Sequence, residues 1–157
     1  MALKYRHATI SDAKLLFNWA NDHKVREASF YSAPIEWENH IDWFNKKLVD
    51  RKTHILIFYN EVASVGLTRI EQNEYSVISI SVDAAFRGKG YTKFMLNQAC
   101  DEYWEHNSTP IHAFIKKDNE ASIKAFIKAG FKHLKDEIIN GHACSVYIVE
   151  TRQHPLH

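Results

Sequence analysis

The chain has 157 residues, which suits one domain, and its 45% hydrophobic and 25% charged residues are those of an ordinary globular protein. Its 20 basic and 19 acidic residues leave a formal net charge of +1, which argues against a nucleic-acid partner. The two cysteines lack paired spacing, which argues against a disulfide framework and a zinc site. The chain shows no apolar leader and no apolar run of about 18 residues, which argues against a membrane span.

The opening third of the chain predicts a strand and two helices. A short strand is expected at residues 3–8, after which Ser11 can cap a helix with apolar residues at helical spacing. Residues 21–33 are polar and aperiodic, which is typical of a loop. Pro34 then precedes a second helix, expected at about residues 37–49.

The centre of the chain changes to the two-residue period of strands. Residues 54–58 and 63–70 are apolar or β-branched runs that predict a hairpin, and residues 75–82 alternate as a third strand. A glycine loop at residues 87–90 follows, and then a helix is expected from residue 91 to about residue 106. The order strand, glycine loop, helix is the feature that points to function.

The last third predicts a strand, a helix and a hairpin. We expect a strand at residues 111–115, a helix at 120–129 that Gly130 ends, and two strands joined at Asn140 and Gly141. The whole order βααβββαβαββ predicts an α/β domain with a mixed, mostly antiparallel central sheet and helices on both faces. We expect residues 1–157 to form this one domain, with the last few residues as a tail.

The glycine loop can bind an anion. Gly88 and Gly90 permit positive φ and a close approach of the backbone, at the N-terminus of a helix whose free amides and dipole favour negative charge. Arg87 and Lys89 add positive charge. The alternative is an ordinary turn with two solvated basic residues, and the loop has the spacing of neither a Walker motif nor a dinucleotide fingerprint.

The loop resembles the acetyl-CoA signature of the GNAT acetyltransferases. That signature is Arg or Gln, two residues, Gly, one residue, then Gly or Ala, and it maps onto Arg87, Gly90 and Thr92, where Thr92 departs from the pattern. Residues 118–131 resemble the next helix of the family, and the opening of the chain resembles its first strand and helix start. The resemblance covers roughly residues 4–150.

This resemblance implies a single-domain GNAT fold in which a splayed pair of strands holds acetyl-CoA as cosubstrate. It implies direct attack of a primary amine on the thioester in a ternary complex, without a covalent enzyme intermediate. The residues expected to bind the cofactor are Ile80, Ser81, Val82, Arg87, Gly88, Lys89, Gly90, Tyr91, Thr92, Asn119, Ser122 and Phe126.

The usual proton-transfer groups of the family are absent from this chain. Phe126 stands where many relatives have a tyrosine acid, and Val77 where many have a glutamate base. Candidate replacements are Ser79 or Ser81, acting through an ordered water, and His40, whose imidazole can accept a proton near neutral pH. His40 is alternatively a histidine on a helix surface. Further candidates are Glu71, Glu74 and Tyr91.

Residues 18–44 resemble the helical region of GNAT enzymes that acetylate nucleotide-linked aminosugars, such as those of the pseudaminic-acid pathway. Phe30 and Trp37 suit stacking on a sugar or base, Arg26 suits a diphosphate, and His40 completes the expected substrate-binding set. The alternative is that these aromatic residues only pack the second helix onto the sheet. The main enzymatic rival is a peptide or ribosomal-protein N-terminus as acceptor.

A non-catalytic acyl-CoA sensor is the rival from another class, and Phe126 and Val77 favour it. The ten histidines show no metal-ligand spacing, and Cys100 and Cys144 suit packing positions, so no metal is expected. We expect a cytoplasmic protein with a small-molecule amine substrate, no nucleic-acid or membrane partner, and a possible homodimer through the last strand, residues 145–149.

Overall fold

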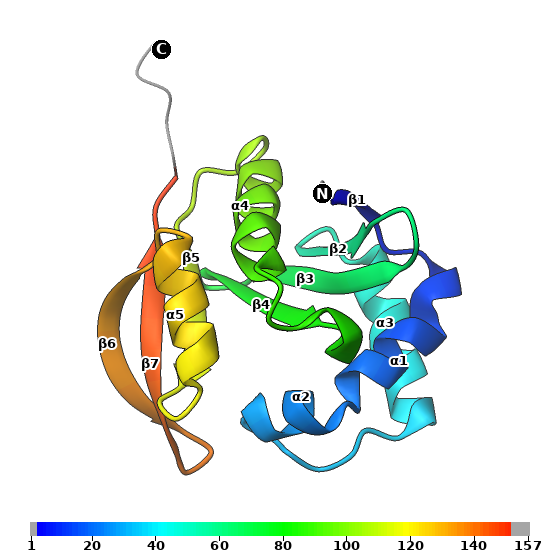
Figure 1. The fold of residues 1–157 in the computed structure, drawn as a ribbon, viewed down its shortest axis with the longest axis horizontal. Coiled ribbons are helices and arrows are strands. Elements are labelled where there is room, and N and C mark those ends of the chain that lie inside the picture. Colours follow the sequence, from blue (N-terminus) through cyan, green and yellow to red (C-terminus); the bar gives the residue numbers. More distant parts are fainter. Residues whose placement is uncertain (1–2, 152–157) are drawn as a thin grey trace.

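Seven strands form one sheet in the order β1-β2-β3-β4-β5-β7-β6 in the computed structural model, which describes residues 3–151 (Figure 1). The elements are β1 Lys4–His7, α1 Ala13–Ala20, α2 His23–Ala28, α3 Trp37–Val49, β2 Thr53–Tyr59, β3 Ser64–Gln72, β4 Ser76–Val82, α4 Tyr91–Trp104, β5 Ile111–Lys116, α5 Glu120–Lys128, β6 Lys132–Ile139 and β7 His142–Val149. Neighbouring strands are antiparallel except for the parallel pair β4 and β5. The predicted mixed, mostly antiparallel α/β fold is confirmed, whereas the predicted tail lies outside the described residues.

Two hydrophobic clusters cover opposite faces of the sheet. On β3, Thr68 and Ile70 face α4, whereas Leu67 belongs to the cluster that α1 and α3 form. This follows from the two-residue period of a strand. Figure 1 shows α1, α2 and α3 grouped together, away from α4 and α5. The α4 stripe of Met95, Ala99 and Tyr103, each at most 2% exposed, is buried against the sheet.

The helix starts near the N-terminus differ from the prediction. The capping role predicted for Ser11 is wrong, because a 3-10 turn at Ile10–Asp12 precedes α1. The Asp12 carboxylate accepts hydrogen bonds of 2.8 Å from the Thr9 amide and from both terminal nitrogens of Arg6. The N-cap is therefore Thr9, two residues before Ser11, and the Asp12 carboxylate that reaches back to its amide is held by Arg6 of β1.

A short helix lies within the segment predicted as a loop. Helix α2 begins after Asp22, whose carboxylate accepts hydrogen bonds from the amides of Lys24 and Val25. None of its six residues is buried, so it lacks the apolar stripe by which a sequence indicates a helix. Its cap and its contacts with other elements stabilise it in place of a core-facing surface.

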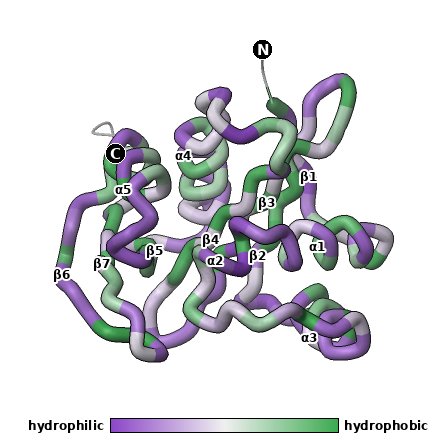
Figure 2. Tube along the Cα trace, turned by 60° about the horizontal axis from the view of Figure 1, so that its bottom comes forward, coloured by the Kyte–Doolittle hydropathy of each residue, from purple (hydrophilic) through white to green (hydrophobic). Residues whose placement is uncertain are grey.

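The C-terminal hairpin confirms one turn prediction and corrects an interface prediction. Asn140 and Gly141 both have positive φ, 48° and 77°, as a two-residue hairpin turn requires. However, β7 lies inside the sheet between β5 and β6, so residues 145–149 do not form an edge. The edge strand is β6, which is mostly exposed and is drawn largely in the hydrophilic colour in Figure 2.

Candidate active site

The parallel strands β4 and β5 separate soon after they meet. Their register contains only two pairs, Ser76 with Ile111 and Val77 with His112. Beyond Val77, no described strand pairs with the β5-facing edge of β4, although the other edge stays paired with β3 as far as Val82. Backbone amides and carbonyls along residues 78–82 are therefore available to an extended ligand.

The close contact between β3 and β4 depends on a glycine. A Cβ atom added to Gly66 would lie 2.3 Å from the Ser81 carbonyl oxygen and 3.1 Å from the Cα of Val82. Side chains of any size are thus excluded at Gly66. Because Gly66 has no side chain, β3 can pair closely with β4 at residues 81 and 82, which belong to the segment predicted to contact the cofactor.

The loop that follows β4 has the backbone of an anion site. Gly88 and Gly90 have φ of 74° and 80°, the left-handed region that favours glycine, and nothing lies within 4 Å of where a Cβ would stand at either position. Gly90 directly precedes the 14-residue helix α4, whose first amides have no partner within the helix. Exposed Lys89 adds positive charge beside this helix end.

Arg87 organises the loop. One terminal nitrogen of its guanidinium lies 2.6 Å from the Asp22 carboxylate, and its Nε donates to the Val82 carbonyl at 3.1 Å. Because Asp22 also caps α2, the guanidinium links the glycine loop to that helix. The pKa of Asp22 is lowered: burial acts to raise it, but the hydrogen bonds and charge of Arg87 and the helix amides outweigh that effect.

The segment around α2 connects the two separated strands. On the β4 side, the Trp19 indole donates to Asp83 at 2.8 Å, in addition to the Arg87 ion pair. On the β5 side, the Lys116 ammonium donates to the Glu27 carbonyl at 2.7 Å. The Asn140 side chain donates to the Phe30 carbonyl at 2.6 Å. Polar contacts from both halves of the sheet therefore hold this segment in place.

An open groove of about 570 Å³ lies where β4 and β5 begin to separate. Its lining residues come from β3 to β6 and from the chain after α2, and they are Phe30, Arg69, Glu71, Asn73, Glu74, Tyr75, Val77, Ile78, Ser79, Phe114, Glu137 and Ile139. Three of these residues are carboxylates and three are aromatic. The set suits an organic ligand with a positive charge.

The three carboxylates differ in their partners. Glu71 lies 2.6 Å from the Lys47 ammonium and 2.9 Å from Arg69 Nε, and Glu137 lies 2.6 Å from Lys135. Glu74 is exposed and has no ion pair among the described residues. Its charge is therefore the one most available to a ligand in the groove.

An unpartnered imidazole nitrogen lies at the vertex of the two strands. His112 pairs in register with Val77, and its ring centroid lies 4.5 Å from that of Tyr75. Its Nδ1 is buried and has no hydrogen-bond partner within the described structure. Sequence reasoning did not identify His112, Phe114 or Glu137 as part of this region, because only the strand register brings them together.

Of Ser79, Ser81 and His40, Ser79 alone lines the groove, and of the further candidates Glu71 and Glu74 also line it, whereas Tyr91 does not. Ser79 is exposed, whereas Ser81, two residues further along the same face, is partly buried outside the groove lining. His40 is 3% exposed, and its Nε2 lies 2.8 Å from the Ala13 carbonyl oxygen, between α3 and α1. The interpretation of His40 as a surface histidine is wrong, because aromatic rings of α1 and α3 enclose it.

The predicted substrate-binding residues separate in space. Phe30 lines the groove, but Trp37 packs edge-on against Phe17, with ring centroids 5.1 Å apart. The Arg26 guanidinium donates to three backbone carbonyls and to the Ser29 hydroxyl. Arg26 is thus occupied in shaping the loop after α2, and Trp37 supports α1.

The predicted cofactor residues of α5 have local partners. The Asn119 side chain accepts a hydrogen bond of 3.3 Å from the Ser122 amide and so caps the helix. Phe126 is 3% exposed and packs edge-on against Phe131 in the core. Its ring cannot take the acid role of a tyrosine, since it has no hydroxyl group.

Among the described residues, no group of three or more histidine, cysteine, aspartate or glutamate side chains is arranged to hold a metal ion. Within the same residues, no helix is long and apolar enough to cross a membrane. Both cysteines are buried and neither forms a disulfide, and burial raises the pKa of the Cys144 thiol.

The chain resembles acetyltransferases in sequence and in structure. A family model described as an acetyltransferase (GNAT) domain matches residues 2–132. Among solved structures, spermidine N-acetyltransferase from Vibrio cholerae in complex with CoA and spermine aligns with a TM-score of 0.84 and 18% identity, over 94% of this chain and 95% of that chain. No curated protein matches the chain.

Two further solved structures have similar folds. A putative acetyltransferase from Salmonella typhimurium with its cofactor acetyl-CoA aligns with a TM-score of 0.79 and 17% identity, over 99% of this chain and 97% of that chain. Ribosomal-protein-alanine N-acetyltransferase from Brucella melitensis aligns with a TM-score of 0.81 and 21% identity, over 94% and 99% of the two chains. At these identities the likeness establishes the fold.

Proposed function

Because the chain belongs to the acetyltransferase (GNAT) family, we propose that it transfers the acetyl group of acetyl-CoA to the primary amine of a small, positively charged acceptor. The observation that carries this proposal is the open edge of β4, which leads into a glycine loop at the N-terminus of α4. Two solved structures of similar fold, whose identity to this chain is below 20%, contain CoA or acetyl-CoA.

The residues of the site fit acetyl-CoA. The amides at the start of α4, with Gly88, Gly90 and Lys89, suit its pyrophosphate. The free edge of residues 80–82 suits its extended amide-containing arm, because each backbone group there can pair as it would with another strand. Bound acetyl-CoA would supply an activated acetyl group as a thioester.

Residues of this chain position the acceptor and accept or relay the proton that its ammonium group loses. An amine arrives at neutral pH as an ammonium ion and must lose a proton before its nitrogen can form the new bond to the acetyl carbon. The carbon–sulfur bond then breaks, and the CoA thiolate takes a proton from solvent. We assign the first proton transfer to the exposed Ser79, through an ordered water to solvent, with Ser81 further along the same face. His40 lies outside this route.

The charges of the groove support a cationic acceptor. Glu71 is paired with Lys47 and Arg69, and Glu137 with Lys135, whereas Glu74 has no ion pair among the described residues, so its carboxylate supplies the uncompensated charge of the lining. The rings of Tyr75 and Phe114, with centroids 6.1 Å apart, add faces that attract a cation. A diphosphate would be repelled by a carboxylate of the lining. The Arg26 guanidinium that could attract it already donates hydrogen bonds to backbone carbonyls.

A nucleotide-linked aminosugar is the second candidate acceptor, and the aromatic lining favours it. Phe30, Tyr75 and Phe114 all line the groove and offer surfaces on which a sugar or a base can stack. A peptide or ribosomal-protein N-terminus is the third. Each of the three candidates presents a primary amine, so one assay compares them.

The test is thiol release from acetyl-CoA with a panel of polyamines, UDP- and dTDP-linked aminosugars and N-terminal peptides. We expect release with a polyamine or another small cationic amine. Glu74→Gln should raise the KM for that amine about threefold to tenfold while kcat changes less than about twofold, because it removes charge that binds ground state and transition state alike.

Glu61→Gln is the matched control. Glu61 is also an exposed carboxylate, and it lies on the β2–β3 turn, away from the groove lining. Release with a sugar nucleotide alone would establish the second candidate in place of the first. Tight acetyl-CoA binding without release on any amine would overturn the enzymatic proposal in favour of a sensor.

A further inference from the structure

A second cavity lies on the opposite face of the sheet from the groove. It has a volume of about 180 Å³ and opens between the C-terminal end of α4 and strands β1, β2 and β3. Thr68 and Ile70 line it, whereas the residues that alternate with them on β3, Arg69 and Glu71, line the groove. The sheet therefore separates this cavity from the site of acetyl transfer.

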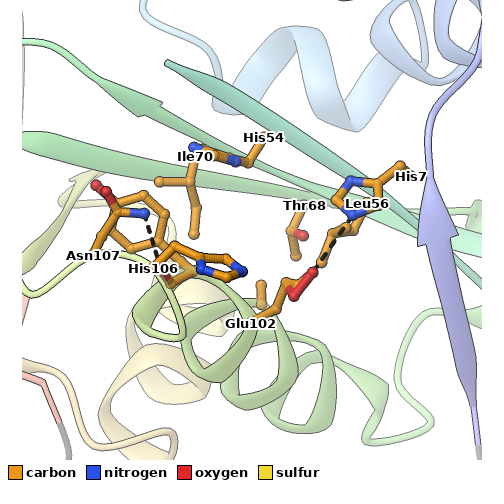
Figure 3. Close-up of a pocket in the computed structure, with 10 residues that line it drawn as sticks. His7, His54, Leu56, Thr68, Ile70, Glu102, His106 and Asn107 are labelled. Atoms are coloured by element: carbon orange, nitrogen blue, oxygen red, sulfur yellow. Dashed lines mark hydrogen bonds and ion pairs between the residues drawn. The ribbon is translucent and has the colours of Figure 1, made fainter. Parts of the chain in front are cut away.

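Polar side chains converge on the cavity from β1 to β3 and from α4. Figure 3 shows His7 and His54 from the strands, with Glu102, His106 and Asn107 from α4 and the chain that follows it. Leu56, Ile70 and Ala99 supply an apolar part of the lining, and all three are buried. The cavity thus offers polar groups beside an apolar surface, as small-molecule sites do.

A buried hydroxyl group in the lining has no partner. Thr68 is 1% exposed, and its Oγ1 makes no hydrogen bond within the described structure. A buried polar group without a hydrogen bond is unfavourable, so native proteins seldom leave one unless something else satisfies it. Since Thr68 lines the cavity (Figure 3), a ligand there can provide the missing partner.

The electrostatics of the cavity favour a cation. Glu102 contributes a carboxylate, whose Oε1 lies 3.4 Å from Nε2 of the largely exposed His7. The lining residues at the end of α4 lie near its last carbonyl groups, which carry the negative end of the helix dipole.

The imidazole of His54 can serve as a hydrogen-bond acceptor. Burial is the main reason that its pKa is lowered, and the nearby His7 adds to the effect. A neutral imidazole has one nitrogen that accepts a hydrogen bond, whereas a protonated one has none. At neutral pH, His54 therefore adds an acceptor to the carboxylate of Glu102.

We propose that this cavity binds a small organic cation that carries a primary ammonium and a hydroxyl group. Its ammonium would donate to Glu102 and to a histidine nitrogen, and its hydroxyl would pair with Thr68 Oγ1. The short carbon chain would contact Leu56 and Ile70. An organic cation fits better than a metal ion, because the described residues provide no group of three metal ligands.

The size of the cavity limits the ligand to a few atoms. Its volume of about 180 Å³ lies below the roughly 300–1,000 Å³ of pockets that bind drug-sized ligands, so it suits a smaller molecule. Ethanolamine has an ammonium, a hydroxyl and two carbons, which makes it a suitable probe. This site is independent of the proposed acetyl transfer, since none of its lining residues belongs to the groove.

The experiment is calorimetric titration of the full chain with ethanolamine in the absence of acetyl-CoA. We expect saturable binding that Glu102→Gln weakens about tenfold or more, because a charge-assisted hydrogen bond is lost. Thr68→Val keeps the shape of the side chain and should weaken binding about fivefold. Acetyl-CoA binding by both variants should match the wild type, which shows that they are folded.

Two control variants locate the binding. Glu105→Gln removes the same charge from an exposed position just beyond α4 that does not line the cavity, and Glu74→Gln removes a charge from the groove. Both should bind ethanolamine within about twofold of the wild type, since surface charges have small effects. Absence of saturable binding would overturn the proposal. So would unchanged affinity in Glu102→Gln, or an equal loss in Glu105→Gln or Glu74→Gln.

Discussion

At position 40, the surroundings of the side chain decide its role. The imidazole lies among Phe17, Trp37, Trp43 and Phe44, with ring centroids 5.4 to 6.1 Å from its own. Its hydrogen bond to the Ala13 carbonyl joins α3 to α1. Residue type alone is compatible with a base for the acceptor amine, but the burial of His40 indicates a structural function.

Replacing this histidine tests the structural role directly. His40→Phe keeps a ring of similar size but removes the hydrogen bond to Ala13, so the free energy of unfolding should fall by about 1 kcal/mol. The value of kcat should stay within about twofold of the wild type, because His40 does not line the groove. Urea unfolding and steady-state kinetics measure the two quantities. A loss of kcat greater than tenfold at unchanged stability would restore His40 as a proton acceptor.

Short elements near the N-terminus depend on single polar contacts. Strand β1 has no buried residue, and the 3-10 turn that follows it spans only Ile10–Asp12. The ion pair between Arg6 and Asp12 connects the two, with the Asp12 side chain only 7% exposed. At the scale of elements, stability here comes from a charge-assisted hydrogen bond more than from apolar burial.

The pH dependence of stability should reveal the contribution of Asp12. The hydrogen bond from Arg6 is the largest cause that lowers the pKa of Asp12 in the folded protein. A lowered folded pKa means that the stabilisation is complete above the unfolded value, about 3.9, and is lost as the pH falls through the folded value. Asp12→Asn should therefore cost about 1.5–3 kcal/mol at pH 7, and this difference should shrink below about pH 4.

Chemical denaturation between pH 7 and pH 2 measures this difference. Asp42→Asn serves as the control, because Asp42 is an exposed carboxylate on α3. Its effect on the free energy of unfolding should stay within about 0.5 kcal/mol at every pH. A cost for Asp12→Asn that is the same at pH 7 and pH 2 would contradict the expected role of the ionised carboxylate.

At the scale of the molecule, the sheet consists of two halves with a narrow connection. Strands β1 to β4 form one half and β5 to β7 the other, and only two residue pairs of β4 and β5 join them within the sheet. The segment around α2 adds contacts through Asp22, Glu27 and Phe30. A ligand that lies along the open edge of β4 would contact both halves.

Acetyl-CoA should therefore raise the unfolding temperature. A ligand present at about 100 times its Kd adds about 2.7 kcal/mol to the free energy of unfolding. For a chain of this size, that corresponds to a rise of about 5–10 °C. Thermal unfolding followed by circular dichroism, with and without acetyl-CoA, measures the rise.

The glycine loop supplies the control for that measurement. Gly90→Glu should abolish the rise, because it places a negative charge at the N-terminus of α4 and a side chain at a φ of 80°. Gly141→Glu introduces the same residue at a similar φ of 77° in the distant β6–β7 hairpin and should keep the rise. An equal rise in Gly90→Glu would contradict the position of the cofactor site.

The sequence by itself determined the elements that rest on local physics. The apolar spacing of residues 37–49 predicted α3, the period of two predicted β4, and Asn140 with Gly141 predicted a hairpin turn. The glycine loop before α4 was predicted for the same reason, because glycine conformations and helix ends are local properties. Together with the resemblance to a family, these patterns were enough to predict the α/β fold and a cofactor.

Only the tertiary structure decided which side chains share a site. The groove combines Glu74, Phe114 and Glu137 from three separate parts of the chain, and the cavity on the other face combines Thr68 with Glu102. Their proximity depends on strand register and on helix packing, neither of which leaves a local pattern in the sequence. The burial of His40 and the ion pair that occupies Arg87 have the same origin, because both come from contacts between elements distant in the chain.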